Sequence, residues 1–213
     1  MGKKVEVISL IKVKEERLLS EYSPILLIAE KLGLKYLVKE GRFITGPAPS
    51  LVLLIDKLTK NLKIKTMADL CCGTGALTKI AILNGVEKVL CLDKNLKAAR
   101  ENLKGLKEKI RFLEKDVFKF IPDEKFDLIV IDAPRELGEK VIRKVVPRIK
   151  QKCELFVMWH GSCEEEDWNL WVRYRLRKEF KKILEVGIFG DEITCCSSSE
   201  KGMKWLKKLV KIW

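Results

Sequence analysis

The most constraining feature of the sequence is an acid-bearing apolar run that enters a glycine turn, followed by a helical pattern and a second apolar run that ends in an acid. The first run is Met67-Ala68-Asp69-Leu70, the turn is Cys71-Cys72-Gly73-Thr74-Gly75, and the second run closes at Asp93. Gly73 and Gly75 let the backbone turn sharply and approach a ligand closely, because glycine has no Cβ. An acid at the end of the second strand suits the hydroxyls of a ribose. The pattern predicts a nucleotide-binding strand, turn, helix and strand.

Two details of this unit indicate which kind of nucleotide ligand it would hold. A dinucleotide fingerprint would place a third glycine where this chain has Thr78. Asp69 lies in the approach to the turn, where its negative charge would repel phosphates and attract a positively charged amino group. The sequence therefore favours a cationic ligand over a pyrophosphate.

Further along the chain, two more segments follow at compatible spacings. Lys115-Asp116-Val117 places an acid after a third apolar run, and Phe126–Arg135 contains a fourth run with the loop that follows it. With Asp69–Gly75 and Asp93, these segments make the chain similar to the class I S-adenosylmethionine-dependent methyltransferases over about residues 41 to 200. Four such elements in the expected order are a far more specific signal than a glycine pair alone.

The resemblance implies a set of cofactor contacts. Asp69 and the backbone of Gly73 and Gly75 would hold the methionine part of S-adenosylmethionine, and Asp93 would hold the ribose hydroxyls. The remaining expected contacts are Asp116 with Val117 for the adenine, Cys71 where the family usually has its first glycine, and Lys94 and Asp132. Each residue also has a structural interpretation: a glycine pair can form a tight turn only, and an acid such as Asp93 can cap the helix that follows it.

The order of apolar runs and helical patterns after Thr66 predicts an α/β fold. Near-continuous apolar runs such as Leu128–Ile131 are typical of parallel strands covered on both faces. Ile183–Phe189 and Ile193–Ser198, joined at Gly190-Asp191, are expected to form a closing strand pair. We expect a doubly wound, mostly parallel sheet of seven strands with an antiparallel closing strand. Three of its helices are expected over Leu96–Leu106, Leu137–Val146 and Glu165–Lys181.

Three domains or segments are expected along the chain. Residues 1–46 would form a small N-terminal α+β extension with a strand over Val5–Val13, a helix pair and a hairpin. This extension could recognise the substrate or cover an edge of the sheet. Residues 47–200 would form the Rossmann-like domain, and residues 201–213 a basic C-terminal helix. By resemblance, Phe43, Thr45 and Gly46 would lie near the methionine end of the cofactor.

The acceptor of the methyl group is expected at the loop Asp132-Ala133-Pro134-Arg135, where the family presents its acceptor-binding groups. Asp132 could accept a proton, Pro134 would stiffen the loop, and Arg135 could hold a phosphate or carboxylate. The structural alternatives are a helix cap for Asp132 and a solvated surface charge for Arg135. The loop is close to the D-P-P-R or D-A-P-C loop of base carbon-methylating enzymes, but it lacks the cysteine next to proline.

Three residues near the end of the fifth apolar run are further candidates for the chemistry. His160 is the single histidine, and its position makes it a candidate general base, although a structural histidine is the alternative. Trp159 could stack on a base or belong to the core. Cys163 could supply a thiolate for carbon methylation or be a free loop cysteine.

The positive net charge of the chain favours a negatively charged partner. The formal net charge is +13, which favours contact with phosphate backbones, although abundant Lys and Glu with a single Gln also fit a thermophilic protein. Two basic segments with aromatic residues, 173–178 and 201–213, could contact nucleic acid. The latter could instead dock on the core with its lysines in solvent or, less readily, lie on a membrane surface.

The remaining composition excludes several classes of protein. Seven cysteines without a C-x-x-C pair predict neither a zinc site nor a disulfide framework, and no metal is expected. No apolar run reaches about 18 residues, so a cytoplasmic protein without a membrane span is expected. The sequence predicts an S-adenosylmethionine-dependent methyltransferase acting on RNA (tRNA or rRNA). The alternatives are a protein or small-molecule methyltransferase, or a non-catalytic RNA-binding module on the same fold.

Overall fold

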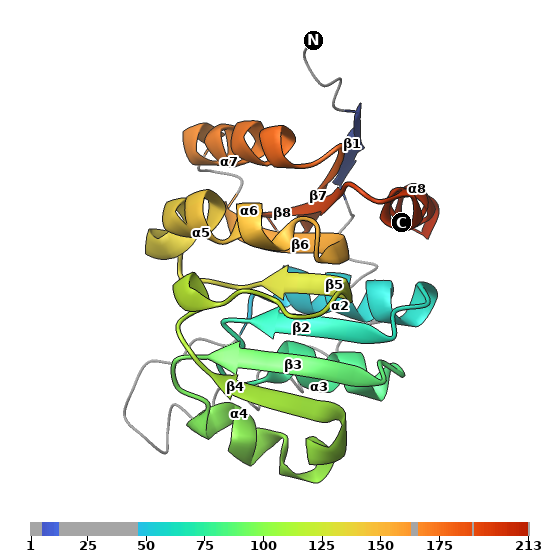
Figure 1. Cartoon of the computed structure of the whole chain (residues 1–213). Helices are drawn as coiled ribbons and strands as arrows, with labels where there is room; N and C mark the ends of the chain where they lie inside the picture. The colour runs from blue at the N-terminus through green and yellow to red at the C-terminus, as the bar shows by residue number, and fades with distance from the viewer. Residues whose placement is uncertain (1–5, 13–46, 163–165, 189, 213) are drawn as a thin grey trace.

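The computed structural model describes residues 6–12, 47–162, 166–188 and 190–212 (Figure 1). Within them, a central sheet is covered by helices on both faces. The strands follow the order β1-β7-β8-β6-β5-β2-β3-β4 across the sheet. Their bounds are β1 Glu6–Lys12, β2 Thr66–Leu70, β3 Lys88–Asp93, β4 Ile110–Glu114, β5 Phe126–Ile131, β6 Cys153–Ser162, β7 Lys182–Ile188 and β8 Asp191–Ser197.

The direction of the strands confirms the expected α/β fold. β8 pairs antiparallel with both β6 and β7, whereas every other pair in the sheet is parallel. The seven predicted strands are present, and β8 is the antiparallel closing strand. The sheet has one strand more than expected, because β1 pairs with the outer edge of β7. The N-terminal segment therefore contributes to the sheet itself.

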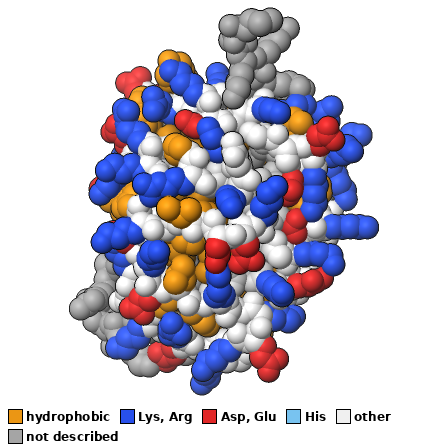
Figure 2. Space-filling model, viewed as in Figure 1, with side chains coloured by type: hydrophobic (Ala, Val, Ile, Leu, Met, Phe, Trp, Pro, Cys, Tyr) orange, Lys and Arg blue, Asp and Glu red, His pale blue; other side chains and the backbone are white. Residues whose placement is uncertain are grey.

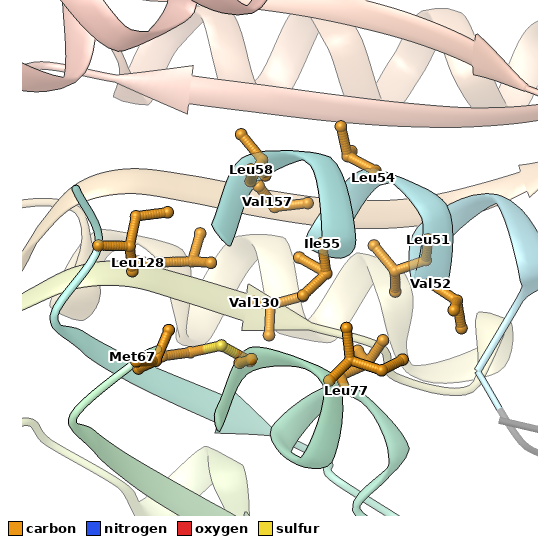
Figure 3. Packing of buried hydrophobic residues seen from close by; sticks show 14 of the residues in the cluster. Leu51, Val52, Leu54, Ile55, Leu58, Met67, Leu77, Leu128, Val130 and Val157 are labelled. Carbon is orange, nitrogen blue, oxygen red and sulfur yellow. The ribbon is translucent and has the colours of Figure 1, made fainter. Parts of the chain in front are cut away.

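The helices divide between the two faces of the sheet. The buried core on one face includes side chains of α2, α3, α4 and α8, and the core on the other face includes side chains of α5, α6 and α7. Figure 3 shows Ile55 of α2 close to Val130 of β5, inside the first of these cores. The bounds are α2 Pro49–Asn61, α3 Ala76–Leu83, α4 Lys97–Asn102, α5 Gly138–Lys144, α6 Val146–Ile149, α7 Glu166–Glu179 and α8 Glu200–Ile212; short 3-10 helices span η1 Lys104–Lys109, η2 Val117–Lys119 and η3 Arg135–Leu137.

Two expected helices are shorter than their apolar patterns indicated. The helix expected over Leu96–Leu106 ends at Asn102 and continues as η1, which contains Gly105, a poor helix former. The helix expected over Leu137–Val146 is divided into α5 and α6 next to Pro147, whose ring and missing N–H disfavour a continuous helix. Apolar periodicity does not register either interruption.

The basic C-terminal helix α8 is docked on the core. Its Leu206 and Leu209 are fully buried, and Trp205 is 9% exposed. Lys201 pairs with Asp127 at the start of β5, with Nζ and Oδ1 2.6 Å apart. The helix therefore lies toward the amino ends of the parallel strands (Figure 1). Within the described residues, no helix is both long enough and apolar enough to cross a membrane.

Candidate active site

Two adjoining cavities lie at the carboxyl ends of β2, β3 and β5, the edge at which open α/β sheets bind ligands. The first has a volume of about 290 Å³ and the second about 400 Å³. They share Cys71, Gly73, Asp132 and Pro134. The first is also lined by Pro47, Ala48, Asp69, Cys72, Thr74, Leu77, Ala133 and Trp159, and the second by Leu92, Asp93, Lys94, Asn95, Lys115, Asp116, Val117, Phe118 and Leu137.

The glycine turn between the cavities has an unusual backbone conformation. Three of its residues have positive φ angles, namely Cys71 (66°), Gly73 (50°) and Gly75 (78°). Glycine adopts positive φ angles readily, whereas residues with a Cβ rarely do. Cys71 therefore has a strained backbone conformation. The N–H groups of Cys71 and Cys72 both donate to the carbonyl oxygen of Leu92, at 2.8 and 3.0 Å. These bonds hold the turn against the end of β3.

The structure places Gly75, an expected cofactor contact, against a neighbouring helix. It lines neither cavity, and it begins α3 in the left-handed conformation. A Cβ at this position would lie 2.6 Å from the Cδ1 atom of Leu103. The absence of a side chain at Gly75 therefore lets the turn pack against α4 and Leu103, whereas Gly73 lines both cavities.

Asp69 is a fully buried carboxyl group with one side paired and the other not. Its Oδ2 atom accepts hydrogen bonds from the Thr78 hydroxyl at 2.7 Å and the Thr78 N–H at 3.2 Å. Its Oδ1 atom has no hydrogen-bond partner within the described residues. Burial raises the pKa of Asp69 to about 7, despite the opposing bonds from Thr78. Thr78, which stands where a dinucleotide site would have glycine, thus orients the acid of the turn.

Two further residues of the first cavity carry buried polar atoms without a partner in the described part of the chain. They are Thr74, through Oγ1, and Trp159, through the indole Nε1. Buried polar atoms normally have partners, so unpaired ones beside a cavity indicate that a ligand supplies the missing bonds. An acid with two neutral donors suits an amino acid group, since Asp69 can accept from an ammonium and the donors can bind a carboxylate. The residues fit the methionine end of S-adenosylmethionine.

The second cavity brings together the other acids expected to bind the cofactor. Asp93 accepts from the N–H of Gly73 at 3.0 Å and from that of Asn95 at 3.1 Å, one bond to each oxygen. Each oxygen keeps acceptor capacity for a ribose hydroxyl. Asp116 accepts from the Phe118 N–H at 3.0 Å, and the Nζ atom of Lys94 lies 3.2 Å from its other oxygen. That hydrogen bond and the Lys94 charge lower the pKa of Asp116.

The acceptor loop lies where the two cavities meet. Asp132 and Pro134 line both of them, and Asp132 follows directly after β5. The pKa of Asp132 is raised to about 7, chiefly by burial and further by the negative charges of Asp69 and Asp191. The Ser50 hydroxyl holds Asp191 by a hydrogen bond of 2.6 Å. Asp132 is therefore a carboxyl group that can exchange a proton near neutral pH.

The structure does not bring His160 into either cavity. It is 3% exposed, and both ring nitrogens are 2.8 Å from hydrogen-bond partners. Because an amide oxygen only accepts, Nδ1–H donates to Asn169 and Nε2 accepts from the Thr194 hydroxyl. Burial lowers the pKa of His160 to about 4. This placement favours the structural alternative over the expected general base.

Arg135 also lies outside the linings of both cavities. Its guanidinium carbon is 6.0 Å from the ring centre of Trp168 on α7. Cys163, Phe43, Thr45 and Gly46 lie outside the described residues. Within the part that is described, no group of three His, Cys, Asp or Glu side chains is placed to hold a metal ion.

Several residues of the lining were not expected from the sequence. Leu77, Asn95, Phe118 and Leu137 follow the turn or the strand ends by a few residues, so their proximity to predicted site residues was the available signal. Pro47 and Ala48 precede α2 and reach the first cavity only through the packing of that helix on the sheet. Along the chain they directly follow Gly46, which the resemblance placed near the methionine end of the cofactor, so this proximity was the available signal.

The fold and the site together define a class I S-adenosylmethionine-dependent methyltransferase domain. The family model described as "Methyltransferase small domain" matches residues 49–163, which is more than half of the chain. The chain therefore belongs to the methyltransferase small domain family.

Two curated proteins are similar to this chain in sequence. The ribosomal protein L11 methyltransferase of Aquifex aeolicus is 34% identical over 123 residues, covering 54% of this chain and 48% of that protein. The release factor glutamine methyltransferase of Clostridium botulinum is 29% identical over 160 residues, covering 70% and 54%. The chain spans about half the length of the curated relatives it matches.

Solved structures share the fold at low sequence identity. A candidate RNA methyltransferase from Pyrococcus horikoshii aligns with a TM-score of 0.63 and 16% identity, over 84% of this chain and 97% of that one. The tRNA (uracil-54, C5)-methyltransferase of Pyrococcus abyssi, in complex with S-adenosyl-L-homocysteine, aligns with a TM-score of 0.53 and 17% identity, over 72% and 39%. These alignments support the fold alone.

Proposed function

We propose that this chain transfers a methyl group from S-adenosylmethionine to an RNA, in tRNA or rRNA. The observation that carries the proposal is the buried, unpaired Oδ1 atom of Asp69 in a cavity that also contains the acceptor-loop acid, Asp132. The cofactor, when bound, supplies an electrophilic methyl group on a sulfonium. The residues around the crevice account for binding it and for positioning an acceptor beside it.

Each group of residues has a role in this proposal. Asp69 binds the ammonium of the methionine part, and the backbone of the turn at Gly73 lets the cofactor pass between the two cavities. Asp93 binds the ribose hydroxyls, and Asp116 and Val117 flank the adenine. In-line transfer depends on the orientation of the acceptor, which Pro134 and Asp132 would fix. Asp132 would also take up a proton from an acceptor that carries one.

The net charge of +13 supports RNA as the acceptor, because a basic protein attracts the phosphate backbone strongly. Two of the structural neighbours bear names of RNA methyltransferases. Against this stands the fact that the curated relatives in sequence are named for protein substrates. A protein acceptor is therefore the second candidate, and it would use the same cofactor crevice.

Two measurements test the proposal, one for binding of the cofactor and one for the identity of the acceptor. Calorimetry with S-adenosylmethionine should give saturable binding that Gly73→Val abolishes, because a β-branched residue at φ 50° would strain the turn that lines both cavities. Incubation with labelled cofactor and cellular RNA should then label RNA, and mass spectrometry of the nucleosides should reveal one new methylated nucleoside. Absence of cofactor binding would contradict the proposal as a whole.

The two alternatives give different outcomes in the same assay. Label found only in protein, with ribosomal proteins and release factors included as acceptors, would support the protein methyltransferase. Equal RNA binding with and without cofactor, with no transfer of label, would support a non-catalytic RNA-binding module. In that case Asp132→Ala would change no measured property of the RNA complex.

A further inference from the structure

We propose that a surface formed by η3, α5 and α7 binds a single-stranded segment of the RNA substrate next to the acceptor loop. We name it the tryptophan platform, and it consists of Arg135, Arg143, Trp168, Trp171 and Arg175. Its position rests on aromatic and charge geometry, while the identity of its ligand as the substrate rests on the proposed function.

The centre of the platform is a pair of stacked indoles on α7. The rings of Trp168 and Trp171 have centres 5.3 Å apart and planes inclined by 11°. Neither side chain is fully buried, although both belong to the margin of the core. A nucleic-acid base can stack on an indole ring or on a guanidinium plane that covers it, whatever the base, because every base has a π face. A partly exposed cluster of indoles and guanidinium groups is therefore suited to a strand whose bases are unpaired.

Three arginines surround the indoles. The guanidinium carbons of Arg143 and Arg175 lie 5.5 and 5.9 Å from the ring centre of Trp171, and that of Arg135 lies 6.0 Å from Trp168. A guanidinium that lies over an aromatic ring still presents N–H groups that bind phosphate oxygens. On this side of the molecule, over α5 and α7, Figure 2 shows Lys and Arg side chains around hydrophobic ones.

The platform is fixed in place relative to the active site. The indole N–H of Trp168 donates to the carbonyl oxygen of His160 at 2.6 Å. A Cβ at Gly138 would lie 2.8 Å from the Trp168 ring, so α5 and α7 pack closely here. The His160 side chain binds Asn169 in the first turns of α7. Arg135 directly follows Pro134, which lines both cavities. A strand on the platform would thus pass beside the crevice.

The other basic segments are less suited to this role. Arg173 is 3.0 Å from Glu192, and Arg177 is 3.1 Å from Glu185, and the carboxylates of these pairs are largely buried on β7 and β8. Arg143 of the platform also pairs with an acid, Glu139, through Nε at 2.6 Å, but both of these side chains are about half exposed. An exposed ion pair contributes little and competes less with a phosphate than a buried one. The helix α8 docks toward the amino ends of the strands, away from the cavities. An acidic peptide could also bind arginines, but it would gain little from two stacked indoles. Arginines and stacked indoles on one surface therefore favour RNA over an acidic peptide.

The test measures binding of a fluorescein-labelled, short single-stranded RNA of mixed sequence to the full chain by anisotropy. Trp171→Leu should weaken binding about tenfold, the magnitude expected when one base loses its stacking partner. The double variant Arg143→Ala/Arg175→Ala should weaken binding and reduce the slope of log affinity against log salt by about 1.4. Its matched control is Lys204→Ala/Lys207→Ala on α8, which removes the same charge from exposed positions and should leave both quantities close to wild type.

The readouts separate this inference from the proposed function. Each variant is checked for its melting temperature and for S-adenosylmethionine binding, which should match the wild type. Variants that are folded and bind RNA like the wild type would overturn the platform, even if the wild type methylates RNA. Equal losses in both double variants would also overturn it, because charge alone would then explain binding. If the wild type transfers label to a protein and the platform variants reduce that transfer, the surface binds a protein acceptor and the inference is overturned.

Discussion

The Asp93 carboxylate accepts a hydrogen bond from the Gly73 N–H at 3.0 Å, which joins the end of β3 to the glycine turn after β2. The same side chain lines the second cavity. One acid therefore shapes the turn and faces the position proposed for the ribose, so its removal should affect both.

We expect Asp93→Ala to raise the dissociation constant for S-adenosylmethionine at least about tenfold, because hydrogen bonds to a charged group contribute about 1.5–3 kcal/mol. Calorimetry measures this change. Asp93→Asn, which keeps one acceptor oxygen, is the matched control and should lose less. Unchanged affinity in the alanine variant would contradict the ribose role.

The affinity for S-adenosylmethionine should decrease as the pH is lowered below about 7. The pKa of Asp69 is raised to about 7, so the acid is protonated below that pH and cannot bind an ammonium without losing the proton. The dissociation constant should rise by up to about tenfold per pH unit, because one proton is released on binding. Asp69→Asn should bind weakly at every pH. A flat wild-type profile between about pH 5 and 7 would exclude this contact.

Asp132→Asn should stabilise the protein above neutral pH while lowering the rate of transfer. The folded pKa of about 7 lies above the ordinary value of 3.8, so wild-type stability falls as pH rises between these values. The gain in free energy of unfolding should be absent near pH 3.8 and reach at least about 1 kcal/mol above pH 7. Chemical denaturation across this range measures it, and an equal gain at all pH values would show that burial of charge is not the cause.

His160→Ala should destabilise the fold without removing an ionisation from the rate profile. The substitution leaves Asn169 and Thr194 without their buried partner, at a cost of about 2–4 kcal/mol in the free energy of unfolding. Because the pKa of His160 is lowered to about 4, the variant should keep the shape of the pH–rate profile near neutrality. Loss of a limb of that profile, at unchanged stability, would restore His160 as a general base.

Gly202→Ala should loosen α8 from the core. A Cβ at Gly202 would overlap the carbonyl oxygen of Glu154 and the Ser197 hydroxyl, so the helix has to move away. We expect a loss of about 2–3 kcal/mol in the free energy of unfolding. Gly105→Ala is the matched control, since nothing lies within 4 Å of its added Cβ. Equal stability of the two variants would contradict the docking described for α8.

Much of the fold could be predicted from the sequence, because several strands carry apolar runs that are followed within a few residues by an acid or a glycine turn. Asp69, Asp93 and Asp116 could be assigned to one edge of the sheet, since parallel strands bring their carboxyl ends together. These assignments depend only on neighbours along the chain. The same local information gave no reason for β1 to extend the sheet, because an alternating strand carries no signal for its partner.

Other expectations differ from the structure because of contacts between distant segments. The basic run 173–178 looked uniform, but the acids of β7 and β8 neutralise Arg173 and Arg177, while Arg175 lies over Trp171. His160 followed a strand at the expected edge, yet Thr194 and Asn169 hold both of its nitrogens. Such partners depend on tertiary packing, which sequence periodicity does not encode.

The pairing of β1 with β7 has a consequence for synthesis of the protein. Glu6 lies opposite Lys182, so these partners are separated by most of the polypeptide. During synthesis, β1 is made long before β7. The backbone N–H and C=O groups of β1 that pair with β7 therefore lack these partners until β7 and β8 have been made. Completion of the sheet is therefore expected to be a late step in folding, which follows the synthesis of β7 and β8.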